Sequence, residues 1–175
     1  MADRRPEIIV TERTDEFVEI DALAYPEDIN LIVDPYAVLE DSDANMGELI
    51  AKAEATLPRP LGEIITSRPR TLSATWLFRL VLLDFDRQRH CQAEMVEKTL
   101  CQFLWQVASL KVRRLRLDRF ELLEPCISAY RVLVCLCDQT TKLEAAGIPP
   151  PGTLIFSLQK QAALRHYKLA LANLP

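Results

Sequence analysis

The chain has 175 residues, of which 49% are hydrophobic and 26% are charged, and its formal net charge is −4. This composition is typical of one globular domain, here residues 1–175, and it excludes a disordered chain. The acidic balance argues against nucleic acid as a partner, and no apolar run approaches the roughly 18 residues of a membrane span. The N-terminus lacks the apolar core of a secretory signal, so we expect a cytoplasmic protein.

The first third of the chain predicts three strands and a helix. Residues 7–12 and 16–23 have strand length and apolar spacing, and the turn residues between them predict an antiparallel hairpin. Residues 29–33, INLIV, form a continuous apolar run that suits a strand covered on both faces. Residues 45–57 repeat apolar side chains at helical spacing.

Strands and helices alternate through the rest of the chain. Strands are predicted at residues 62–67, 75–85, 112–117 and 153–158, and helices at 90–110, 122–146 and 160–174. The later helices are long enough to serve as crossovers between parallel strands. The pattern therefore predicts an α/β protein of three layers, α/β/α, with a mixed sheet.

This order of elements and the stretch LGEIITSRPRTLSATWLFRLVLLD (61–84) resemble the macro domain, the family whose members bind or process ADP-ribose. The resemblance is one of pattern and covers residues 16–172. It implies that Asp21, in EIDAL, stands at the position of the family's acid that contacts adenine. It likewise implies that Asp34, in LIVDP, stands at the position of an asparagine that contacts the distal ribose. These two are the candidate ligand-binding residues.

The resemblance fails at the two loops that would hold the phosphates. They would fall at residues 40–49, where only Gly47 is present, and at residues 118–126, which contain no glycine. A pyrophosphate is held by converging backbone N–H groups, often in conformations that glycine adopts most easily. The acids of the first loop would also repel a diphosphate. We therefore expect a degenerate ligand site, with no cofactor.

The predicted strand 112–117 carries Arg113, Arg114 and Arg116, whereas strands inside a parallel sheet are usually apolar throughout. Either both of its faces are only half covered, or it is an edge strand. The basic run 111–119 could also bind an anion or RNA, but it contains no aromatic residue for base stacking. A solvated strand face, or pairing with the acidic N-terminal third, is the favoured interpretation.

Other motifs are incomplete. Residues 41–52 imitate a calcium-binding loop, but Met46 and Lys52 stand where glycine and glutamate are required, so an acidic turn that caps a helix is favoured. The five cysteines lack the spacing of a zinc site and are expected to be reduced. Asp84 and Asp86 end the long strand 75–85, and two acids two residues apart could serve a metal or acid–base chemistry. Exposure to solvent, or pairing with Arg87 and Arg89, is the favoured interpretation.

Three functions are therefore compared. The favoured one is a non-catalytic protein-interaction or regulatory module with lost phosphate loops, which would have a protein partner or self-associate. The second is a divergent binder or hydrolase of ADP-ribose or a nucleotide, using Asp21 and Asp34. The third is a small hydrolase that uses Asp84 or Asp86.

Overall fold

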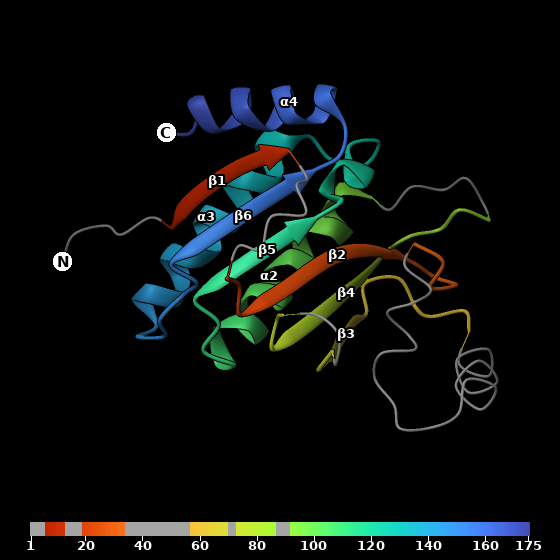
Figure 1. The fold of residues 1–175 in the computed structure, drawn as a ribbon, viewed down its shortest axis with the longest axis horizontal. Coiled ribbons are helices and arrows are strands. Elements are labelled where there is room, and N and C mark those ends of the chain that lie inside the picture. The colour runs from red at the N-terminus through yellow and green to blue at the C-terminus, as the bar shows by residue number, and fades with distance from the viewer. Residues whose placement is uncertain (1–5, 13–18, 34–56, 70–72, 87–91) are drawn as a thin grey trace.

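A computed structural model of the chain describes residues 6–12, 19–33, 57–69, 73–86 and 92–175 (Figure 1). They contain a six-stranded sheet in the order β1-β6-β5-β2-β4-β3. The strands are β1 (Glu7–Glu12), β2 (Ala22–Asp28), β3 (Ile64–Ser67), β4 (Trp76–Leu83), β5 (Arg114–Asp118) and β6 (Thr153–Leu158). All neighbouring pairs are parallel except β3 and β4, which are antiparallel. The mixed sheet confirms the predicted fold class.

The predicted N-terminal hairpin is wrong. The strand at residues 7–12 pairs in parallel with β6, and β2 lies between β5 and β4. The strand predicted at 16–23 begins only at Ala22. Ile8 and Val10 pack against the main core. Contacts with residues distant in the sequence therefore determine where this strand pairs.

The strand predicted at residues 29–33 is also wrong, because β2 ends at Asp28 and a turn follows. The backbone N–H of Leu31 donates to the carbonyl of Asp28 at 2.9 Å, and Leu31 has a φ of 56°. The observed strand, ALAYPED, contains Pro26 and ends in two acids, and these residue types are uncommon in an inner strand. The adjacent apolar run INLIV was the more conspicuous signal.

The three helices of the described residues are α2 (Ala93–Ser109), α3 (Ala129–Ala145) and α4 (Gln161–Ala172). They confirm the predictions at 90–110, 122–146 and 160–174, although α3 starts later than expected. A 3-10 turn, η2 (Phe120–Leu123), follows β5, and Ser128 caps α3 by accepting from the N–H of Arg131 at 3.3 Å. The predicted helix 45–57 lies outside the described residues.

The main core lies between the sheet and these helices, with α2 and α3 behind the sheet in Figure 1. Phe78 of β4 meets Phe103 of α2 edge-on, with ring centroids 5.2 Å apart. Phe156 of β6 contacts Phe120 of η2 and Tyr167 of α4. Aromatic contacts therefore join each end of the sheet to the helices that cover it.

β5 lies inside the sheet, between β6 and β2, which decides the position that the sequence left open. Leu115 and Leu117 point into the main core, whereas Arg116 and Asp118 lie on the other face of the strand. The Nε of Arg116 donates to Asp118 at 2.6 Å, and its Nη2 donates to Ser157 of β6 at 3.1 Å. Pairing within the sheet thus accommodates the charges of an inner strand.

None of the helices in the described ranges is both long enough and apolar enough to cross a membrane. Within the same ranges, no three histidine, cysteine or acidic side chains gather as a metal site would require.

Candidate functional site

The C-terminal ends of β2, β4 and β5 meet at one edge of the sheet. We call the segments at residues 27–33, 84–86 and 118–124 the carboxyl edge. Ligands of open α/β sheets bind in the crevice outside the C-terminal ends of the strands. The carboxyl edge is therefore the candidate functional site.

Glu27, the penultimate residue of β2, is fully buried. Its Oε1 accepts from the backbone N–H of Asp28 at 2.9 Å and from that of Val33 at 2.8 Å. One carboxylate oxygen thus binds two main-chain donors, one in the strand and one in the following loop. Hydrogen bonds to an ionised acceptor are about twice as strong as those between neutral groups.

Asp28 is also fully buried and joins two loops of the carboxyl edge. Its Oδ1 accepts from the N–H of Asn30 at 2.8 Å, and its Oδ2 accepts from the N–H of Phe85 at 2.9 Å. The side chain of Asn30 in turn donates to Asp86 at 2.8 Å. The loops after β2 and β4 are therefore held together by one buried carboxylate.

The segment after β5 is tied to the loop after β2 and to the end of β6. Arg119 has a φ of 58°, and its Nη1 donates to the carbonyl of Val33 at 2.6 Å. Glu121, buried in η2, accepts from the backbone N–H of Gln159 at 3.1 Å. This segment is where the resemblance placed the second phosphate loop, and here carboxylates and a guanidinium hold the backbone.

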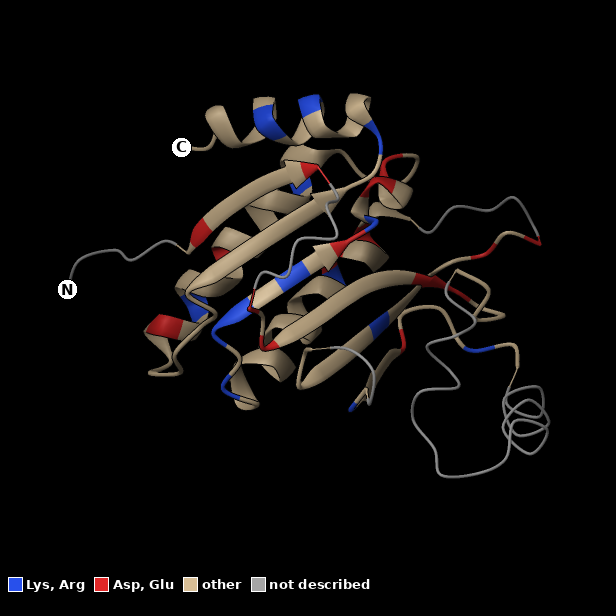
Figure 2. Cartoon of the chain, in the orientation of Figure 1, with Lys and Arg blue, Asp and Glu red and all other residues tan. Residues whose placement is uncertain are grey.

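The charge of the carboxyl edge is mainly negative. Figure 2 shows acidic residues at the C-terminal ends of β2 and β5, where the loops begin. The acids of the carboxyl edge are Glu27, Asp28, Asp84, Asp86, Asp118, Glu121 and Glu124, and its only basic residue is Arg119. A diphosphate approaching this edge would meet repulsion as well as occupied amides.

The structure places Asp21 at the opposite edge, before the N-terminal ends of β2, β4 and β5. Its Oδ2 accepts from the N–H groups of Arg113 and Arg114 at 2.7 and 2.9 Å. Its backbone carbonyl accepts from Thr75 and Trp76. Asp34 lies outside the described residues. Their role in adenine and ribose contacts stays a prediction.

Asp84 and Asp86 lie beyond the end of β4, in a turn. Asp86 accepts from Asn30, as described above, and Asp84 is half-buried. No set of metal ligands surrounds them within the described ranges. The calcium-like loop at 41–52 lies outside those ranges.

Sequence reasoning missed Glu27, Asp28, Arg119 and Glu121 as the residues that organise this edge. The available signal was the tetrapeptide YPED at 25–28, in which two acids follow a strand-length apolar segment. Acids are almost never fully buried unless they are paired, so the strand had to be identified before they could be recognised.

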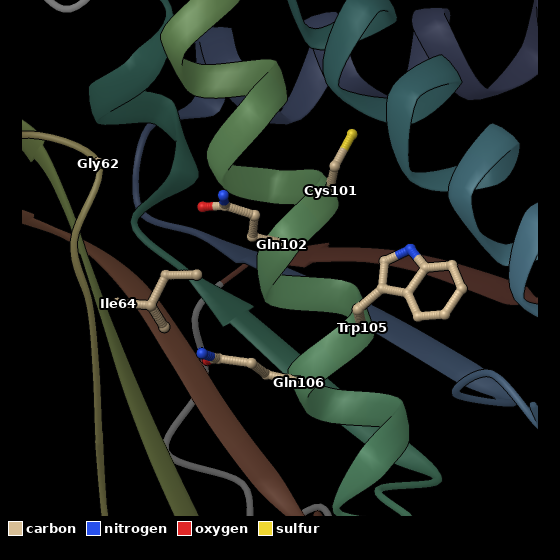
Figure 3. A pocket seen from close by; sticks show the side chains of 6 residues that line it. All are labelled: Gly62, Ile64, Cys101, Gln102, Trp105 and Gln106. Atoms are coloured by element: carbon tan, nitrogen blue, oxygen red, sulfur yellow. The ribbon is translucent and has the colours of Figure 1, made fainter.

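Away from the carboxyl edge, a hollow of about 650 Å³ lies between β3 and α2 (Figure 3). We call it the β3–α2 groove, and its lining residues are Gly62, Ile64, Cys101, Gln102, Trp105 and Gln106. Gln102 and Gln106 point toward Ile64, whereas Trp105 and Cys101 point away from it. Trp105 is 40% exposed, whereas Trp76 lies half-buried with Arg68 stacked 4.5 Å from its ring.

No family model and no curated protein matches the chain by sequence. Solved structures do match it by shape. A macrodomain of Trypanosoma brucei has a TM-score of 0.64 and 14% identity, covering 96% of this chain and 67% of that one. The Oceanobacillus iheyensis macrodomain, solved with ADP, has a TM-score of 0.61 and 13% identity, covering 94% of this chain and 88% of that one. A variant of it, solved with ADPR, has a TM-score of 0.59 and 13% identity over 94% of this chain and 90% of that one. The chain has the macrodomain fold.

Proposed function

We propose that this chain is a non-catalytic macro-fold module that acts through protein contacts and does not cradle a diphosphate. One observation carries the proposal: buried carboxylates of the chain itself occupy main-chain donors of the carboxyl edge. Glu27 and Asp28 between them accept from four backbone N–H groups. Glu121, in the same edge, accepts from the backbone N–H of Gln159, which directly follows β6.

Occupied donors matter because a phosphate is bound by the same groups. Anion sites at loops and helix N-termini depend on several N–H groups that point at one ligand. A diphosphate would have to displace the carboxylates from these amides, leaving buried charges without partners. Segment 118–126 also has no glycine that would let the backbone approach a ligand closely.

Apolar side chains on the same edge favour a protein partner. Ile32 is 54% exposed and Phe85 is 46% exposed, and they lie on the two loops that Asp28 joins. Large apolar groups on a fixed loop pair are a feature of interaction surfaces. A partner or a second copy of the chain could cover Ile32 and Phe85. Binding would then cost little conformational entropy, because Asp28 already holds the two loops in place.

The second candidate is a divergent ADP-ribose or nucleotide binder. It is favoured by the structures solved with ADP and ADPR, whose fold this chain shares. Such a ligand would have to be held by residues outside the described carboxyl edge or by a rearranged edge.

A thermal-shift titration with ADP-ribose separates the two. A ligand present at about 100 times its Kd stabilises the folded state by about 2.7 kcal/mol. For a chain of this length that corresponds to a rise in Tm of about 5–11 °C. We expect no rise at millimolar ADP-ribose. A dose-dependent rise of several degrees would reject the proposal in favour of the second candidate, and Asp21→Ala would then show whether that residue contributes.

The protein-contact part is tested by light scattering on a sizing column, over a range of concentrations. We expect a self-associated species, or a monomer that becomes larger with its partner, and the double substitution Ile32→Ser, Phe85→Ser to abolish the association. Leu169→Ser is the matched control, because Leu169 is 66% exposed on α4 and does not belong to the loops that carry Ile32 and Phe85. Association that survives the double substitution would exclude this surface.

A further inference from the structure

Two cysteines meet where α2 packs against α3. The Sγ atoms of Cys101 and Cys135 are 4.0 Å apart, and both side chains are half-buried and carry no disulfide. Each cysteine is near the middle of a helix of 17 residues, which holds its backbone firmly. The contact is therefore a lasting feature of the helix interface.

Polar groups of both helices surround Cys135. Its Sγ lies 3.7 Å from the backbone carbonyl of Glu97, and the side chain of Glu97 pairs with Arg131 at 2.8 Å. Burial raises the pKa of the Cys135 thiol to about 12, and the neighbouring Cys101, Glu97 and Asp138 add to the shift. Cys135 is therefore a protonated thiol at neutral pH.

Both thiols are partly exposed, so a small oxidant in solution can reach the pair. Cys101 borders the β3–α2 groove, but its side chain points away from Ile64 (Figure 3). The pair therefore has one thiol that can be attacked and a second thiol in contact with it.

We propose that Cys101 and Cys135 form an oxidation site in which a peroxide links α2 to α3 by a reversible disulfide. The Cys101 thiol is oxidised by hydrogen peroxide to a sulfenic acid with release of one water. The Cys135 sulfur then attacks the Cys101 sulfur, the S–O bond breaks, and a second water leaves with the Cys135 proton. The two thiols lose two electrons and two protons, and the peroxide is reduced to water.

The geometry requires a modest movement. A disulfide has an S–S bond of about 2.05 Å, so the sulfur atoms must approach by about 2 Å. Rotation about the two Cα–Cβ bonds and a small shift of the helices can supply this. Cys137 is two residues further along α3 and faces another side of the helix, so it is the matched control.

The test treats the full chain with hydrogen peroxide, blocks remaining thiols with N-ethylmaleimide and digests with trypsin without reduction. Cys101 falls in the peptide 99–111, and Cys135 falls in 132–142 together with Cys137. We expect these two peptides to be linked, with two hydrogens lost, and to separate on reduction with dithiothreitol. Cys137→Ser should keep the link, whereas Cys101→Ser and Cys135→Ser should lose it while circular dichroism shows an unchanged fold.

Two results would overturn the proposal. One is a link that needs Cys137 and survives Cys135→Ser. The other is peroxide-treated protein in which Cys101 reaches the sulfinic acid without a link.

Discussion

Replacing Asp28 by alanine tests whether one carboxylate holds the carboxyl edge together. Asp28 is fully buried and accepts from the N–H groups of Asn30 and Phe85 at 2.8 and 2.9 Å. A hydrogen bond to a charged group contributes about 1.5–3 kcal/mol. Both donors lie in turns that water can partly reach, so we expect a loss of about 3 kcal/mol in the free energy of unfolding. Tm should then fall by about 6–12 °C.

The assay is urea unfolding together with amide hydrogen exchange. Asp28→Ala should lower the urea midpoint and speed exchange at Asn30 and Phe85. The matched control is Asp86→Ala, which removes one exposed hydrogen bond from the Asn30 side chain and should change stability by no more than about 0.5 kcal/mol. If Asp28→Ala costs less than about 1 kcal/mol, or if the two variants behave alike, the buried carboxylate does not organise this edge.

Three further outcomes are expected. Asp21→Ala should lower Tm by several degrees without any ligand, because its carboxylate binds the N–H groups of Arg113 and Arg114; a change below about 1 °C would contradict this structural role. Arg79→Met should keep or raise Tm, since Arg79 is 5% exposed and its Nε and Nη1 have no hydrogen-bond partner among the described residues; a clear fall would show an ion pair elsewhere. The pKa values of Cys135 and Tyr167 are both raised by burial, so the folded state is stabilised below pH 9 and loses this stability as pH rises toward 12. Urea midpoints should fall less steeply in Cys135→Ser over that range; equal slopes would contradict the Cys135 shift.

The sequence predicted the elements of the C-terminal two thirds well because their signals are local. The helix α2 has a continuous apolar stripe, and β6 matches its predicted range of 153–158. The start of α3 was less accurate because Phe120–Leu123 forms a 3-10 turn, whose short apolar run is read as helix. The macro-domain resemblance, which rested on this same pattern, is confirmed at the level of the fold.

The pairing of the described N-terminal strands was predicted poorly because it depends on distant segments. Nothing near residues 7–12 in the sequence indicates that the partner strand is 153–158. The acids of β2 are buried only because loops from other strands supply donors to them, and single-sequence patterns do not show those donors. The ligand-binding roles of Asp21 and Asp34 stay predictions, and the residues of the carboxyl edge were missed because the groups at the strand ends come together only in three dimensions.

The strand order also has a consequence for how the chain assembles. β6 lies between β1 and β5. β1 therefore cannot pair with the sheet until β6, the last strand of the described chain, has been synthesised. During synthesis residues 7–12 must remain without their partner while about 140 residues emerge, and closure of so long a loop is slow. An incomplete chain would expose the β5 edge on which β6 should pair, a surface that favours contacts between nascent chains. Pairing of β6 is thus a late folding step. It covers the exposed edge of β5 and gives β1 its partner at the same time.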